Sequence, residues 1–141
     1  MSTETNKAIV RRYIEQVLNN QRHDLIEEFL AETVEFHGPG GSFTGLAEVT
    51  KWLTSLATAF PDWHTTIDDT IAEGDKVVIQ NTSSGTHQGE MEGIPATGKP
   101  YTQYALTLYR LTNGKIVEGR VQTDILSMMQ QLGLMSASQA A

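Results

Sequence analysis

Apolar residues in the first half of the chain recur at helical spacing. Over residues 6–19 they fall at every third or fourth position, which predicts an amphipathic helix with a broad apolar face. A second, short helix is expected to begin at Asp24, and a third to span Gly45–Phe60, where Pro61 ends it. Between these two helices Val34–His37 is typical of a short strand, and the glycines that follow it predict a loop.

From Trp63 onward the apolar period shortens to two residues, as expected of strands with one buried face. Four such strands follow one another, and the last turn between them is an Asn-Gly hairpin signal. The strands are expected at 63–71, 76–85, 101–111 and 115–123. Asp124 then caps a last helix over Ile125–Leu132.

The segment Gly85–Gly98 holds four glycines, a proline and a lone histidine, too many breakers for a helix or a central strand. We therefore expect an irregular connection between two strands. Loops built in this way on a rigid scaffold often close over a binding cavity.

Because helices come first and hairpin-linked strands follow, the order of elements predicts an α+β domain. We expect a curved antiparallel sheet that forms a cone-like barrel, with the N-terminal helices packed on its concave side. The mouth of such a barrel is a natural ligand site. One domain is expected over residues 1–141, with its core at about 6–134 and a flexible C-terminal tail.

Composition narrows the function classes. A formal charge of −7, with no basic cluster beyond Arg11–Arg12, argues against a nucleic-acid partner. No apolar run approaches the roughly 20 residues of a membrane helix, and the polar N-terminus has no signal-peptide pattern. The absence of cysteine fits a cytoplasmic protein, and the four histidines lack the paired spacing of a zinc site, so we expect no metal.

Five short motifs occur in one order along the chain. They are Ile9–Arg12, Thr86-His87-x-Gly89, Gly93–Gly98, Asn113–Ile116 and Gln130–Gly133. Each alone is weak, but the ordered set resembles the SnoaL-like polyketide cyclases, a family of the nuclear transport factor two-like α+β barrel superfamily. The resemblance spans about residues 6–134.

This resemblance implies the same fold and a small hydrophobic ligand of the polycyclic, polyketide type. The best-known members close a ring of an aromatic polyketide ester by an intramolecular aldol reaction, without a metal or a cofactor, so we expect neither here. The family also implies a homodimer. A second copy that covers the exposed side of an open sheet gives an independent reason to expect one.

The positions of the family's acid/base residues hold other residues in this chain. The last strand reads Gly119-Arg-Val-Gln-Thr-Asp124 where the resembling cyclases read His-Arg-Asp-Trp-Pro-Asp, so Val121 replaces the acid. A second active-site histidine corresponds to Thr107. Three functions therefore stay open: an aldol cyclase or related proton-transfer enzyme, a polyketide hydroxylase or epoxide-opening enzyme, and a non-catalytic binding module.

Arg120, Gln122 and Asp124 share one face of the last strand and are candidates for the site. An arginine there suits an enolate or a carboxylate ester. Asp124 is interpreted either as an acid/base group at the barrel mouth or as the N-cap of the final helix. Strand parity alone leaves open whether this row faces the cavity or solvent.

Two histidines are further candidates. His37 precedes the glycine loop, and the resemblance places this position near the barrel mouth. A histidine there suits proton transfer, with structural hydrogen bonding as the alternative. His87 is interpreted as a hydrogen-bond donor that orders the Gly85–Gly98 loop, with a role as a base as the alternative, and is a candidate substrate contact.

Aromatic residues from different elements are the better evidence for a ligand. They are Phe36, Trp52, Trp63 and Tyr104. Most of them are expected to be core, and one or two to line an apolar cavity, with Phe36, Trp63 and Tyr104 as the candidates and the Tyr104 hydroxyl suited to a flat polycyclic molecule.

Overall fold

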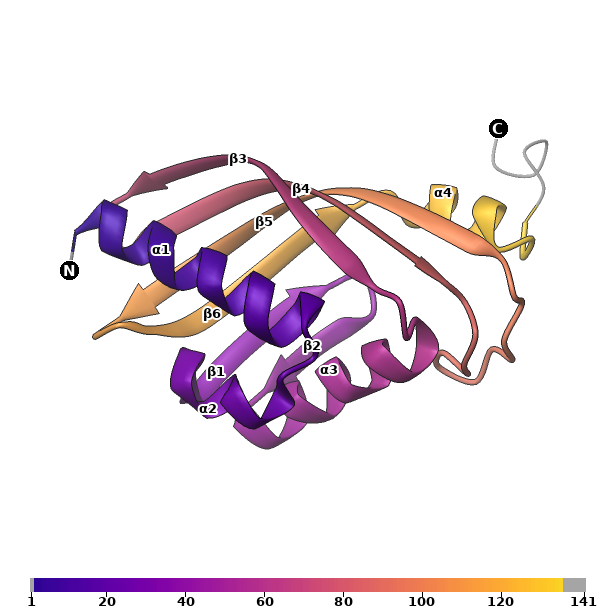
Figure 1. Ribbon diagram of the computed structural model, residues 1–141, viewed down its shortest axis with the longest axis horizontal. Helices are drawn as coiled ribbons and strands as arrows, with labels where there is room; N and C mark the ends of the chain where they lie inside the picture. The colour runs from indigo at the N-terminus through magenta and orange to yellow at the C-terminus, as the bar shows by residue number, and fades with distance from the viewer. Residues whose placement is uncertain (1, 136–141) are drawn as a thin grey trace.

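The helices form where the apolar spacing places them (Figure 1). The computed structural model describes residues 2–135, so the tail expected to be flexible lies outside the described residues. The helices are α1 (Thr3–Tyr13), a π-helix that continues it (Ile14–Asn19), a 3-10 turn (His23–Leu25), α2 (Ile26–Phe29), α3 (Leu46–Ala59) and α4 (Ile125–Gln131). Within residues 2–135, none of them is long and apolar enough to cross a membrane.

Six strands form one sheet in the order β2-β1-β6-β5-β4-β3. The strands are β1 (Leu30–Gly38), β2 (Gly41–Thr44), β3 (His64–Glu73), β4 (Lys76–Thr86), β5 (Pro100–Thr112) and β6 (Lys115–Thr123). The four strands predicted from Trp63 onward are confirmed, and every end lies within two residues of its predicted position. The sequence pattern misses β2, a four-residue strand that begins among the glycines after β1.

The sheet is mixed, whereas an antiparallel sheet was expected. All neighbours are antiparallel except β1 and β6, which run parallel, with Phe36 beside Gly119 and His37 beside Arg120. The parallel pair arises because α3 takes the chain from β2 to the far edge of the sheet. The strands β3 to β6 then return, one neighbour at a time, until β6 lies beside β1 (Figure 1).

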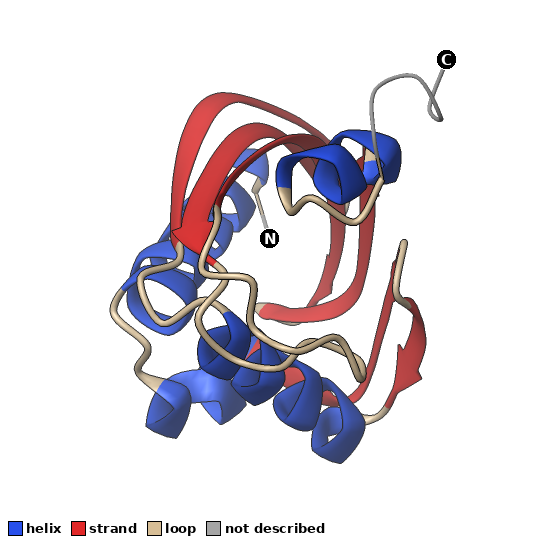
Figure 2. Ribbon diagram, turned by 90° about the vertical axis from the view of Figure 1, so that its right-hand side faces the viewer, coloured by secondary structure: helices blue, strands red, loops and turns tan. Residues whose placement is uncertain are grey.

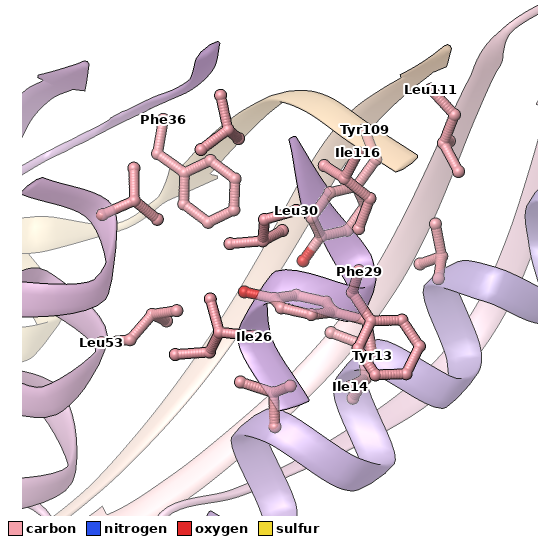
Figure 3. Packing of buried hydrophobic residues seen from close by; sticks show 14 of the residues in the cluster. Tyr13, Ile14, Ile26, Phe29, Leu30, Phe36, Leu53, Tyr109, Leu111 and Ile116 are labelled. Atoms are coloured by element: carbon pink, nitrogen blue, oxygen red, sulfur yellow. The ribbon is translucent and has the colours of Figure 1, made fainter. Parts of the chain in front are cut away.

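The helices α1 and α3 lie on the concave side of the curved sheet, as predicted (Figure 2). The main core fills the space between them and includes Tyr13 from α1, Phe36 from β1 and Tyr109 from β5 (Figure 3). The ring of Tyr109 packs edge-on against both others, with centroids 6.0 Å from Tyr13 and 6.4 Å from Phe36. Each fully buried side chain of this kind contributes roughly 1.5–3 kcal/mol of hydrophobic stabilisation.

A smaller apolar cluster holds the other end of the sheet together. It joins the end of α3, the start of β3, the start of β5 and the end of α4. Its buried members are Ala59, Phe60, Trp63, Tyr101 and Leu132.

The connection between β4 and β5, residues 87–99, is anchored to the end of α3. The amides of Gln88 and Gly89 both donate to the Ala59 carbonyl, at 2.9 and 3.2 Å. Gly89 lies so close to α3 that a Cβ on it would stand 2.2 Å from the Thr58 carbonyl oxygen. Only a residue without a side chain permits this contact, so Gly89 fixes where the loop lies.

We expect Gly89→Ala to destabilise the protein by about 1–3 kcal/mol, because the added methyl group meets backbone atoms that cannot move independently. Thermal or urea unfolding measures the loss. Gly38→Ala is the matched control, since its methyl group would lie 3.8 Å from Val121, an ordinary contact. Equal stability of the two variants would contradict the close approach of loop and helix.

Candidate functional site

A cavity of about 900 Å³ lies between the concave face of the sheet, the helices α1, α3 and α4, and the 87–99 loop. Residues 90–94 of the loop line it, as expected of a loop that closes over a cavity. Aromatic side chains from two helices, three strands and the α3–β3 connection form much of the wall. They are Tyr13, Phe36, Phe43, Trp52, Phe60, Trp63, Tyr101 and Tyr109.

Four neutral polar side chains form a hydrogen-bonded chain on the buried wall of the sheet. The Thr107 hydroxyl donates to Asn81 Oδ1 at 3.1 Å, and Asn81 Nδ2 donates to Ser83 Oγ at 3.4 Å. The Ser83 hydroxyl in turn shares a 2.8 Å hydrogen bond with Thr65 Oγ1. All four residues line the cavity and are at most 5% exposed. They are therefore placed to meet the polar groups of a ligand.

These four residues were missed by the sequence analysis, although a signal exists. Asn81 and Ser83 lie on the same face of β4 as Val77 and Ile79, and Thr107 lies on the same face of β5 as Tyr109. Polar residues that interrupt the buried face of an alternating strand are unusual unless they are hydrogen-bonded or functional. That interruption could have identified them.

The charged residues of the lining all lie at the solvent-exposed rim. They are Glu48, Lys51, Glu90 and Glu92. Among the described residues that are both buried and on the cavity wall, none has a carboxylate, an imidazole or an amine. The interior can therefore donate and accept hydrogen bonds, but its side chains offer no general base that titrates near neutral pH.

The row Arg120, Gln122 and Asp124 lies outside the cavity. The β6 residues on the cavity wall are Gly119, Val121 and Thr123, so the intervening side chains project from the other face of the sheet. Arg120 is exposed, and its Nη2 lies 3.3 Å from Glu118 Oε2. The alternative in which this row faces solvent is the one that the geometry supports.

Asp124 is the N-cap of α4, as the sequence predicted. Its Oδ1 accepts a hydrogen bond from the Ser127 amide at 3.0 Å, and the side chain is exposed. The cap satisfies one of the free amides of the first helical turn.

His37 is half-buried and reaches the cavity rim. Its Nδ1 lies 2.8 Å from Ser42 Oγ, and its Nε2 lies 3.9 Å from Glu35 Oε2. Phe36, its neighbour in β1, is buried and forms part of the cavity wall. By alternation with Phe36, the His37 side chain projects from the same face as Arg120. It points toward Glu35 and Glu118, and its contacts fit structural hydrogen bonding.

His87 orders the loop from a fully buried position. Its Nδ1 accepts a hydrogen bond from the Thr97 amide at 3.3 Å and lies 3.0 Å from the Thr97 hydroxyl. The ring packs against Phe60 and is absent from the cavity lining. At Nδ1 the imidazole is therefore an acceptor of the backbone N–H, where a donor was expected.

Of the predicted aromatic contacts, Trp63 lines the cavity and Tyr104 does not. Trp63 is 8% exposed and packs against Phe60 and Tyr101. Tyr104 is 73% exposed, because the buried face of β5 carries Tyr101, Ala105 and the other odd-numbered residues. The expectation that Tyr104 lies inside is corrected by this parity.

The two positions that correspond to the family's acid and histidine are adjacent on the wall. Thr107 and Val121 are register partners of β5 and β6, and both line the cavity. Gly119, where the cyclase motif has another histidine, lies under Phe36: a Cβ there would stand 2.8 Å from the ring. The space for a side chain at Gly119 is therefore already filled.

The sequence matches the family model described as SnoaL-like polyketide cyclase over residues 8–132. A curated relative, the aklanonic acid methyl ester cyclase DnrD from Streptomyces peucetius, is 30% identical over 139 residues, which cover 94% of this chain and 92% of the relative. A solved SnoaL-like structure from Jannaschia sp. CCS1 has a TM-score of 0.87 at 23% identity and 94% coverage of both chains. TsrD from Streptomyces laurentii has a TM-score of 0.84 at 21% identity, covering 96% of this chain and 99% of its own. The two structures share the fold of this chain.

We expect Asp124→Ala to lower the free energy of unfolding by about 1 kcal/mol, because Ser127 loses its hydrogen-bond acceptor. Asp124→Asn, the matched control, should unfold almost like the wild type, since asparagine is nearly as good an N-cap. Thermal unfolding compares the two variants. A loss of turnover of about 100-fold or more in a well-folded Asp124→Asn protein would instead identify Asp124 as the acid/base group.

Proposed function

Because the chain belongs to the SnoaL-like polyketide cyclase family, we propose that it is a cofactor-free enzyme for a hydrophobic, polyketide-like carbonyl substrate. The substrate binds in the cavity and undergoes an aldol-type ring closure or a related proton transfer. The observation that supports this proposal is the neutral hydrogen-bonded chain from Thr65 to Thr107 in the wall of an aromatic cavity.

Orientation is the first contribution to catalysis. The aromatic walls hold a flexible polycarbonyl chain in one folded shape, with the nucleophilic carbon against the carbonyl carbon that it attacks. Holding two reacting groups in this way can supply roughly 7–11 kcal/mol of the barrier. A cavity of about 900 Å³ has room for a polycyclic product.

Stabilisation of the enolate is the second contribution. Asn81 Nδ2 and the Thr107 hydroxyl are donors that can turn to a ligand oxygen in a cavity with largely aromatic walls. The carbon between two carbonyl groups is acidic, so its proton leaves to water. The enolate carbon then forms the new bond, and the resulting alkoxide takes a proton from water. This sequence needs no carboxylate at Val121.

A non-catalytic binding module is the main alternative, and the same neutral interior is the reason to consider it. The epoxide-opening alternative was based on Arg120 and Asp124, which lie outside the cavity. Turnover therefore decides between an enzyme and a binding module.

We expect Asn81→Leu to lower kcat for cyclisation by about 10²–10³-fold, the usual cost of one lost oxyanion donor. The substrate for the assay is aklanonic acid methyl ester, from the name of the DnrD relative, together with related β-keto ester anthraquinones, and chromatography follows the product. Thr82→Val is the matched control, because it removes a β4 hydroxyl that bonds Asp68 on the outer face. Unchanged kcat in Asn81→Leu would contradict the proposed donor, and tight binding of these compounds by the wild type without product would favour the binding module.

We also propose that the protein is a homodimer that pairs through the outer face of the sheet. Large apolar side chains are exposed there: Ile71 at 65%, Tyr104 at 73% and Leu106 at 56%. The described helices lie on the other side of the sheet or at its end (Figure 2). Burying these side chains against a second copy removes apolar surface from water.

Sedimentation equilibrium at micromolar concentration should give twice the chain mass of 15.5 kDa. Leu106→Lys should shift the protein toward the monomer, because it places a charge in the apolar contact. Leu126→Lys is the control, since Leu126 is 46% exposed but lies on α4. A wild-type mass near 15.5 kDa would refute the dimer.

A further inference from the structure

Two phenol groups at the inner end of the cavity have no role in the mechanism above. Tyr13 is the last residue of α1, and Tyr109 lies on β5, two residues beyond Thr107. Their rings are edge-on, with centroids 6.0 Å apart and planes at 73°. The side chains are 1% and 5% exposed, yet both belong to the cavity lining. Figure 3 shows that the two hydroxyl oxygens point into the same space.

Neither hydroxyl has a hydrogen-bond partner in the part of the protein that the structure describes, residues 2–135. Neither oxygen is completely sealed from solvent either, unlike His37 Nε2 and His87 Nε2, which are sealed and have no partner. Both oxygens therefore face the cavity. Since no group among the described residues uses either hydroxyl, both are free to bond a ligand, and packing alone would be served equally well by phenylalanine.

The surroundings of the pair are apolar. Its neighbours on the cavity wall include Ile14, Phe36, Leu53 and Ile79. Burial raises the pKa of Tyr109 well above the usual value for a phenol. Burial also raises the pKa of Tyr13, and repulsion from the ionised form of Tyr109 adds to this effect. Both groups are thus protonated across the physiological range, and each is a hydrogen-bond donor in a medium of low polarity.

We propose that Tyr13 and Tyr109 together bind one oxygen of the ligand at the inner end of the cavity. The oxygen is a carbonyl, an enol or a phenol group, because two converging donors need an electron-rich acceptor. The inference rests on the proposed function in one respect, namely that a carbonyl compound occupies this cavity.

The position of the pair also defines the class of ligand. Thr107 and Tyr109 are two residues apart on one face of β5, so their Cα atoms lie about 7 Å apart and both side chains enter the cavity. Between and around them the wall is apolar. A fused-ring phenol or quinone meets this pattern, with one oxygen at the tyrosine pair, a second near Asn81 and Thr107, and its ring faces against aromatic side chains.

The test is equilibrium binding of two unreactive probes, 2-naphthol and 2-methylnaphthalene, which differ by a hydroxyl in place of a methyl group. Titration calorimetry should show that the wild type prefers 2-naphthol. Tyr13→Phe and Tyr109→Phe should each weaken 2-naphthol binding by about tenfold, as expected of one lost buried hydrogen bond, and change 2-methylnaphthalene binding by less than about twofold.

Tyr101→Phe is the matched control, since it removes a phenol oxygen from the same cavity, one that already bonds Gln103 Oε1 at 3.1 Å. It should leave the preference for 2-naphthol intact. The melting temperatures of Tyr13→Phe and Tyr109→Phe should equal or exceed that of the wild type, because no intramolecular hydrogen bond is lost.

The proposal is overturned if the wild type fails to prefer 2-naphthol, or if the two phenylalanine variants weaken both probes equally. Because no reaction is measured, this result is independent of the cyclase assay. Selective 2-naphthol binding without any turnover would keep the tyrosine pair as a ligand anchor and remove the enzyme. Turnover without selective 2-naphthol binding would overturn the tyrosine pair as a ligand anchor and keep the enzyme.

Discussion

Side chains alternate between the two faces of a bent sheet, except where a bulge shifts the register, and the concave face of this one serves two purposes. Near Leu111 and Ile116 it packs against the N-terminal helices and forms the core. Toward Tyr101 the same face becomes the wall of the cavity. The parity of a residue thus decides whether it faces inward, and its distance along the strand decides whether it stabilises the fold or meets a ligand. Tyr109 lies at the boundary and belongs to both the core and the cavity.

The neutral character of the interior follows from this double role. A carboxylate on a wall that continues into the core would lose hydration and would need a counter-charge or a raised pKa. Asn81, Ser83 and Thr107 satisfy one another without charge, and from a buried wall their hydrogen bonds to a ligand are stronger than in water.

Much of the fold could be predicted from the sequence, because long periodic segments such as those over α3 and β5 depend on local spacing. The parallel β1–β6 pair could not, since it depends on which strands meet after the chain crosses the sheet. The site was less predictable for a related reason. Choosing Arg120, Gln122 and Tyr104 required knowing which face of β5 and β6 is inside, and alternation alone does not determine this. On β5 the buried Tyr109 contained that information, but on β6 the register shift after Arg110 changes the parity, so that Ile116 is buried while Arg120 is exposed.

The packing around Phe36 explains why this chain departs from the family's motif at position 119. The Phe36 ring occupies the space above Gly119 and packs edge-on against Trp52 and Tyr109, with centroids 5.7 and 6.4 Å away. A histidine at position 119 would have to displace Phe36 and disturb both of its aromatic neighbours. Val121, in contrast, faces the open cavity, where a carboxylate would have space. The difference from the best-known cyclases therefore lies in the aromatic packing of the cavity wall as well as in the replaced acid, and a single substitution at Val121 leaves that packing unchanged.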